Sequence, residues 1–243
     1  MSSASPGTAP AGSAFRLAEV RARVDAAARA AGRDPGDVRL LVATKTLPLE
    51  VVRAVVTAGA HLIGENTVQE LVAKAPGLAD LGPEVHLIGH LQSNKVASAV
   101  RWAACVQSVD TARIARLLSA RSVAAGRVLD VMVQVNVSGE VSKHGVAPED
   151  ARRLAEEVAL LPGLRLTGFM TIGGRWAEPA DVRAGFALLR GVRDDVEGSG
   201  APGTQAAHEL SMGMSGDLEE AVAEGSTLVR VGTAVFGARP KRD

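Results

Sequence analysis

The sequence predicts an α/β protein built as a (β/α)8 TIM barrel with one extra helix at its N-terminus. Short segments rich in Val, Leu and Ile recur along the chain, and amphipathic segments at helical spacing separate them. The length of 243 residues is ordinary for one such barrel. A doubly wound open sheet is the alternative, but its first strand is usually followed by a glycine-rich turn. Here that turn reads Lys45-Thr46-Leu47-Pro48 and has no glycine, which favours the barrel.

The expected strands and helices alternate after the first helix. Residues 15–31 carry apolar residues at helical spacing and end at Gly32, which predicts the extra N-terminal helix. Eight strands are expected at 39–45, 61–64, 85–90, 105–109, 129–138, 164–172, 209–212 and 228–236. Helices are expected between them at 48–58, 68–75, 95–101, 111–125, 148–161, 179–197 and 218–224. Three of these helices open with residues that favour helix starts: Asp110-Thr111, Ala147-Pro148-Glu149-Asp150 and Ser215-Gly216-Asp217.

Composition narrows the functional classes. The formal net charge is zero, which gives no basis for electrostatic capture of nucleic acid or of an acidic membrane. No apolar run approaches the roughly 20 residues needed to span a bilayer. The single cysteine, Cys105, cannot form an internal disulfide, which suits a reducing cytoplasm. Residues 1–14 are mostly Ser, Ala, Gly and Pro and predict a disordered tail, so residues 15–243 are expected to form one domain.

Lys45 is the most informative residue. The chain has five lysines, and this one ends the apolar run Leu40-Leu41-Val42-Ala43-Thr44. A desolvated amine has a lowered pKa and can attack a carbonyl to form a Schiff base. Catalytic and cofactor groups of a barrel lie at the C-terminal ends of its strands, where this lysine falls. The alternative is a surface lysine at a strand end. Lys95 and Lys143 are rival amines, but both stand in polar loop or helix-start segments.

Two segments near the C-terminus predict an anion site. Barrels often bind phosphate with the loops after strands 7 and 8. The segment 211–216 (Ser-Met-Gly-Met-Ser-Gly) follows the seventh expected strand and opens a helix, so its free amides and hydroxyls can hold an anion. Gly232 and Thr233, in the eighth, add a small residue and a hydroxyl, and Arg230 projects to the same face as Gly232.

A Schiff-base lysine with a phosphate cradle predicts one ligand that carries both an aldehyde and a phosphate. Pyridoxal 5′-phosphate (PLP) has both groups. A phosphosugar bound by a Schiff-base aldolase would also fit, but such an enzyme normally needs acid/base carboxylates beside its lysine. The expected rim of the barrel is nearly free of acidic groups apart from Glu65.

On these residues the chain resembles the pyridoxal phosphate homeostasis family, also called the YggS or PROSC family. Six motifs run in family order from about residue 15 to the end: 43–46 (ATKT), 64–70 (GENTVQE), 86–95 (HLIGHLQSNK), 134–138 (QVNVS), 211–217 (SMGMSGD) and 229–237 (VRVGTAVFG). The family shares its barrel with the N-terminal domain of alanine racemase. The resemblance therefore implies a fold-type III barrel that binds PLP.

The resemblance also assigns roles to individual residues. Lys45 would hold PLP as an internal aldimine, and Arg230 would face the pyridine nitrogen. The other cofactor-binding residues would hold the phosphate (Ser215, Gly232 and Thr233, with Ser211 nearby) or line the pocket (Asn66 and Met214). The implied function is intracellular PLP homeostasis, with indirect effects on amino-acid and keto-acid pools. We expect a monomer that makes transient contacts with PLP-dependent apo-enzymes.

The residues favour a carrier over an enzyme. Racemisation of this type uses two bases on opposite faces of the substrate, and in related racemases the second is a tyrosine; this chain contains none. Few residues follow the eighth expected strand in this sequence, so the second racemase domain is not expected. An arginine beside the pyridine nitrogen disfavours its protonation and weakens the cofactor as an electron sink. The alternative is a PLP-dependent amino-acid racemase or lyase of narrow scope.

No metal site is expected. His86 and His90 are four residues apart, but on a strand those positions lie about 13 Å from each other, too far for one ion. No Cys/His cluster occurs elsewhere in the sequence.

Overall fold

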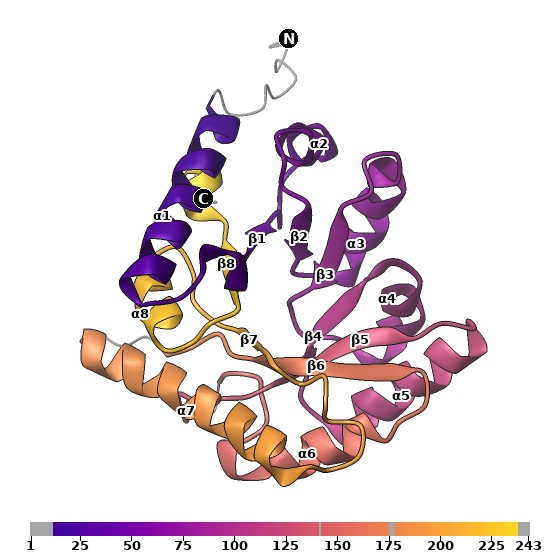
Figure 1. The fold of residues 1–243 in the computed structure, drawn as a ribbon. Helices are drawn as coiled ribbons and strands as arrows, with labels where there is room; N and C mark the ends of the chain where they lie inside the picture. The colour runs from indigo at the N-terminus through magenta and orange to yellow at the C-terminus, as the bar shows by residue number, and fades with distance from the viewer. Residues whose placement is uncertain (1–11, 141, 175–177, 238–243) are drawn as a thin grey trace.

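Eight parallel strands close into a barrel in chain order, with β8 hydrogen-bonded to β1 (Figure 1). The structure is a computed structural model and describes residues 12–140, 142–174 and 178–237. Its strands are β1 (Arg39–Ala43), β2 (Leu62–Glu65), β3 (Glu84–Leu87), β4 (Cys105–Val109), β5 (Leu129–Gln134), β6 (Leu164–Met170), β7 (Glu209–Ser211) and β8 (Leu228–Val231). The predicted (β/α)8 barrel is confirmed.

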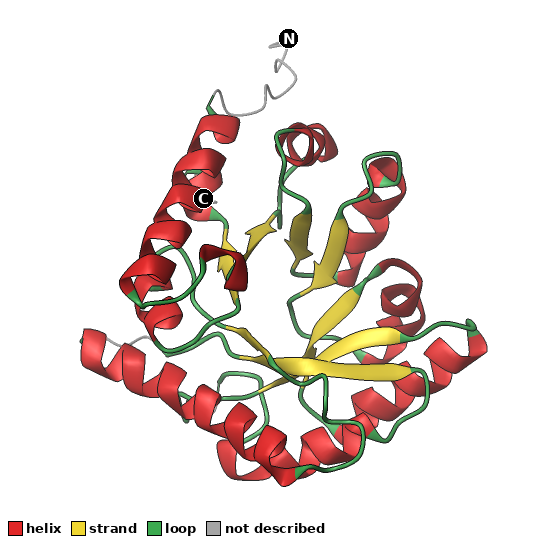
Figure 2. Cartoon of the chain, viewed as in Figure 1, coloured by secondary structure: helices red, strands yellow, loops and turns green. Residues whose placement is uncertain are grey.

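The helices form an outer ring around the strands (Figure 2). They are α1 (Ser13–Ala30), α2 (Leu49–Thr57), α3 (Val68–Lys74), α4 (Val96–Trp102), α5 (Ala112–Ala124), α6 (Pro148–Ala159), α7 (Pro179–Ser199), α8 (Leu218–Ala223) and α9 (Thr233–Phe236). Thr111 caps α5 by accepting the Ile114 amide, and Pro148 is the first residue of α6, as their sequences predict. The extra helix α1 packs against α8 and α9. Within the described residues, none of the helices combines the length and the apolar character needed to cross a membrane.

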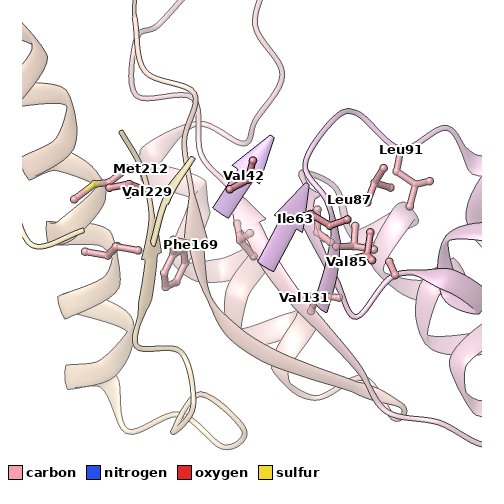
Figure 3. Packing of buried hydrophobic residues seen from close by; sticks show 14 of the residues in the cluster. Val42, Ile63, Val85, Leu87, Leu91, Val131, Phe169, Met212 and Val229 are labelled. Carbon is pink, nitrogen blue, oxygen red and sulfur yellow. The ribbon is translucent and has the colours of Figure 1, made fainter. Parts of the chain in front are cut away.

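Apolar side chains pack in two layers, one on each side of the strands. The outer layer lies between strands and helices and includes Val42, Ile63 and Phe169 (Figure 3). The inner layer fills the barrel and consists of Leu41, Leu62, Ile88, Cys105, Met132, Met170 and Leu228. Consecutive residues such as Leu41 and Val42 belong to different layers, because successive side chains of a strand point to opposite faces. Buried polar side chains that share the inner face, such as Gln107 and Arg230, need hydrogen-bond partners there.

The eighth strand ends earlier than predicted. The expected strand 228–236 is wrong beyond Val231, because Thr233–Phe236 form the helical turn α9. β8 is paired with β1, which ends at Ala43, so β1 provides no strand partner for the residues that follow β8. The amides of the last two residues of α9 donate instead to the carbonyl of Gly232, each at 3.0 Å.

Other element ends also differ from the sequence prediction. β1 ends before residue 45, β3 before residue 90 and β5 before residue 138. After β5, the Asn136 side chain accepts the Ser138 amide at 3.2 Å, which turns the chain out of the sheet. At the N-terminus, α1 begins at Ser13, two residues before its expected start, and residues 1–11 of the predicted tail lie outside the described residues.

Candidate functional site

Lys45 lies in the turn after β1, where the backbone is held on both sides. Its side chain is half-buried, between the buried Thr44 and the exposed Thr46. Thr46 has φ 66, a left-handed conformation that is strained for a β-branched residue. Its amide donates to the carboxylate of Glu70 on α3, which fixes that conformation. Backbone strain of this kind clusters at functional sites.

A buried ion pair supports the strand end just before Lys45. Lys74, on α3, places its Nζ 3.0 Å from both carboxylate oxygens of Glu65 at the end of β2. The same Nζ donates to the carbonyl of Thr44 at 2.9 Å, and the Thr44 hydroxyl donates to Glu65 at 2.6 Å. Burial raises the pKa of the Glu65 carboxyl, and the hydrogen bonds from Thr44 and Lys74 oppose that shift. The peptide that precedes Lys45 is thus anchored to both α3 and β2.

Inside the barrel, Arg230 is a buried cation whose hydrogen-bond partners are neutral. Its Nη1 donates to the Ser211 hydroxyl at 2.7 Å, and its Nη2 donates to the Thr171 carbonyl at 2.6 Å. Among the described residues, no carboxylate forms an ion pair with it. Burial lowers the pKa of Arg230 to about 10, so the guanidinium is still charged at neutral pH. A buried charge without a direct ion-pair partner favours an anionic or electron-rich ligand.

Ser211 connects Arg230 to a chain of hydrogen bonds that crosses the barrel. The Ser211 hydroxyl donates to Gln107 Oε1 at 2.6 Å, and Gln107 Nε2 lies 2.7 Å from His86 Nδ1. His86 Nε2 in turn lies 2.7 Å from Glu84. Because the Gln107 amide nitrogen can only donate, His86 carries its proton on Nε2 and donates it to Glu84. This hydrogen bond is the main cause that lowers the pKa of Glu84 to about 2. The position of Arg230 is therefore supported by a chain of hydrogen bonds that ends at Glu84, the first residue of β3.

The loops after β7 and β8 meet at Ser215. The amide of Ala234 donates to the Ser215 hydroxyl at 3.3 Å. Gly232 packs against the end of β1, where an added Cβ would lie 3.3 Å from a backbone carbonyl. The structure thus brings together the three residues predicted to hold a phosphate, Ser215, Gly232 and Thr233, next to the strand that leads into the lysine turn.

Asn66 and Met214 lie on the C-terminal rim and are exposed. Asn66 follows β2 and lines a surface depression of about 340 Å³ together with Gln92 and Lys95. The next strand end packs directly on it, because a Cβ added to Gly89 would meet the Asn66 carbonyl oxygen at 1.9 Å. Met214 has 39% of its surface exposed. Both residues are placed where they can line the mouth of the barrel.

Comparison with known proteins identifies the family. A family model described as the alanine racemase N-terminal domain matches residues 16–240. A pyridoxal phosphate homeostasis protein of Pseudomonas aeruginosa is 48% identical over 229 residues, which span 93% of this chain and 95% of the relative. This chain belongs to the pyridoxal phosphate homeostasis family. A protein of the same name from Escherichia coli is 40% identical over 234 residues, 93% of this chain and 96% of the relative.

Solved structures agree with this homeostasis-family assignment. PipY of Synechococcus elongatus, solved with PLP bound, is 34% identical with a TM-score of 0.81 and covers 93% of this chain and 100% of that one. An unknown protein from Bifidobacterium adolescentis is 42% identical with a TM-score of 0.91, covering 97% and 98%. An alanine racemase from Streptomyces lavendulae, 20% identical with a TM-score of 0.73, shares the fold over 94% of this chain and 58% of that one.

Two residues that support the site in this homeostasis-family barrel were missed by sequence reasoning. Lys74 was missed although a signal existed: it follows Leu71 by three positions, on the buried face of α3. Gln107 was also missed, and its signal is weaker: a polar residue two positions after Cys105 shares the inner face of β4. Its partners come from other strands, so no local pattern reveals them.

Proposed function

We propose that this chain binds PLP reversibly through Lys45 and serves in intracellular PLP homeostasis as a carrier. The observation that carries the proposal is a half-buried amine in the turn after one strand and, on the strand paired with it, a buried cation that has no ion-pair partner among the described residues. Lys45 follows β1, and Arg230 lies on β8, the strand paired with β1. The ligand would supply an aldehyde carbon, to which the Lys45 amine would bond covalently while the aldehyde oxygen leaves as water; hydrolysis by water would reverse the step. The names of the relatives and the PLP-bound PipY structure support this assignment.

The phosphate of the ligand would lie at the meeting point of the loops after β7 and β8. The Ser215 and Thr233 hydroxyls can donate to phosphate oxygens next to Gly232, whose missing side chain lets this turn pack closely against the end of β1. Ser211 has a different task in this proposal. Its oxygen already accepts from Arg230 and its proton goes to Gln107, so Ser211 positions the guanidinium rather than the phosphate.

Arg230 supports the role of a carrier. The two hydrogen bonds to Ser211 and Thr171 leave other N–H groups of the guanidinium free to face the pyridine nitrogen. Because Arg230 is charged at neutral pH, a second positive charge on that nitrogen is disfavoured. An unprotonated ring withdraws electrons weakly, which favours holding the cofactor over using it for carbanion chemistry.

The proposal also covers the cellular compartment, the oligomeric state and the partners of the protein. The Cys105 thiol is buried and its pKa is raised mainly by that burial, which makes it unreactive and suits a reducing cytoplasm. We assign residues 15–243 to one PLP-binding domain that works as a monomer and contacts PLP-dependent apo-enzymes transiently. Light scattering of the purified protein, with and without PLP, measures the oligomeric state directly.

The absorbance spectrum of the purified protein tests the assignment of Lys45. We expect a visible band after addition of PLP, and borohydride reduction followed by peptide mass mapping should place the pyridoxyl group on Lys45. The variant Lys45→Ala should lose the band, whereas Lys95→Ala, which removes another amine of the same rim, should keep it. A colourless wild-type protein, or an adduct on Lys95 alone, would refute the proposal and favour a phosphosugar ligand.

Solvent exchange separates the carrier from a racemase or lyase of narrow scope. The PLP-loaded protein is incubated with common amino acids in deuterium oxide, and Cα deuteration is followed by mass spectrometry. A carrier leaves Cα unlabelled. Labelling that disappears in Lys45→Ala would instead establish an enzyme.

A further inference from the structure

Three side chains of types that often ligate metals meet on the rim after consecutive strands. His90 follows β3, Asp110 follows β4, and His144 lies in the loop after β5. The two imidazole rings stack with centroids 3.9 Å apart and an angle of 11° between their planes. His90 Nδ1 lies 3.6 Å from Asp110 Oδ2. One ligand atom from each residue can be chosen so that all lie within 4.8 Å of one another.

The carboxylate of this trio is set apart by its surroundings. The Asp110 side chain is only 11% exposed, and the contact at 3.6 Å is too long for a hydrogen bond. Within the described part of the chain, its carboxylate has no hydrogen bond of normal length. A carboxylate so placed, aimed at two imidazoles, keeps its oxygens available for a cation.

We propose that His90, Asp110 and His144 form a binding site for a divalent transition-metal ion, with Zn²⁺ the best fit. Two imidazole nitrogens and one carboxylate oxygen are the protein ligands of many open zinc sites. At metal–ligand distances of about 2.1 Å, tetrahedral ligand atoms lie roughly 3.4 Å apart. The ligand atoms here lie within 4.8 Å of one another, so they must come closer to bind one ion. The two histidines are exposed and can rotate towards Asp110, which is less exposed and stays fixed.

The position of the site indicates which exogenous ligand could complete the coordination of the metal ion. His90 lines the same depression as Asn66 and Lys95. Three protein ligands leave at least one position for water or an anionic oxygen ligand. Lys143, the residue before His144, donates to the Glu140 carboxylate at 2.7 Å and to a backbone carbonyl at 2.8 Å, so its charge is partly offset.

His86, four residues before His90, is not part of this trio: it is buried inside the barrel and hydrogen-bonded to Gln107. The new site uses His90 with a histidine from another loop. The side-by-side pairing of β3, β4 and β5 brings their loops together, which no spacing along the sequence reveals.

Calorimetric titration of untagged protein with Zn²⁺ tests the site, and Co²⁺ substitution reports ligand type and geometry through its visible absorption. We expect one equivalent to bind. His90→Ala, His144→Ala and Asp110→Asn should each weaken binding at least about tenfold. His61→Ala, which removes an exposed histidine outside the trio, should leave it unchanged. Wild-type protein that binds no stoichiometric ion, or binding equal in His144→Ala, would overturn the proposal.

Metal ions also bind PLP itself, so the titration is repeated on Lys45→Ala. Unchanged binding in that variant is expected, because none of the three proposed ligands is the cofactor. Loss of binding there, with His144→Ala unaffected, would assign the ion to the cofactor and refute the site. Thermal unfolding of each variant, with His90→Gln as a milder replacement, separates lost ligation from lost folding.

Discussion

Lys74 and Arg230 are both buried cations near the C-terminal ends of the strands, but the groups around them differ. Lys74 contacts both oxygens of the Glu65 carboxylate at 3.0 Å. Arg230 contacts a hydroxyl and a carbonyl, and neither carries a charge. A buried ion pair is balanced internally, whereas a buried cation with neutral partners is balanced only when a ligand supplies the complementary group. Burial alone therefore does not identify a ligand-binding cation. The absence of a carboxylate in direct contact with the cation is the better indicator.

The first variant breaks the balanced pair. Glu65→Leu leaves the Lys74 ammonium buried without a counter-charge, and we expect the free energy of unfolding to fall by about 3–5 kcal/mol in urea denaturation. The double variant Glu65→Leu/Lys74→Met removes both charges and should return to within about 2 kcal/mol of the wild type. If the double variant were as unstable as the single one, shape rather than charge would explain the effect.

The second variant removes the unbalanced cation. Arg230→Met takes away a charge that forms no ion pair among the described residues, so we expect stability to change by less than about 2 kcal/mol. The affinity for PLP should fall about ten- to a hundredfold, as for the loss of one charged hydrogen bond. Absorbance titration measures the affinity and urea denaturation measures the stability.

Two companion variants control that experiment. Arg101→Met removes an exposed arginine that stacks on Trp102 and should leave PLP affinity unchanged. Gln107→Leu breaks the chain behind Ser211 without touching the guanidinium, and its loss of affinity should be smaller than that of Arg230→Met. An Arg230→Met protein that unfolds like Glu65→Leu would show that the two cations are equivalent after all.

The sequence predicts the barrel and singles out Arg230, but it does not predict the partners that distinguish Lys74 from Arg230. The strand pattern predicted the barrel, and Arg230 was singled out because it shares a face with Gly232. Lys74 was passed over, because one lysine on a buried helix face gives no sign of its partner on another element. Strand ends were also misplaced, since each depends on where the neighbouring strand stops: β8 could not extend along β1 past Ala43.

The smallest expected effect concerns the turn that joins the Lys74 pair to Lys45. Thr46 has φ 66, and a left-handed conformation costs about 1–2 kcal/mol for a residue with a Cβ. Thr46→Gly removes that strain, while Thr46→Ala keeps a Cβ and therefore most of it. We expect the glycine variant to be more stable than the alanine variant by at most about 1 kcal/mol, since glycine adds freedom to the unfolded chain.

Cofactor affinity should move the other way in the same pair of variants. If the left-handed turn holds the Lys45 amine in place, the freer backbone of Thr46→Gly should bind PLP a few-fold more weakly than Thr46→Ala, although it is the more stable protein. The side chain is shortened in both, and the amide that donates to Glu70 is present in both. Stability and affinity that rise together would mean that the strain at Thr46 is a tolerated defect. A glycine variant that is more stable but binds PLP more weakly would mean that the left-handed turn orients the Lys45 amine for the cofactor. The Glu65–Lys74 pair would then support the turn, and Arg230 would face the same cofactor from β8.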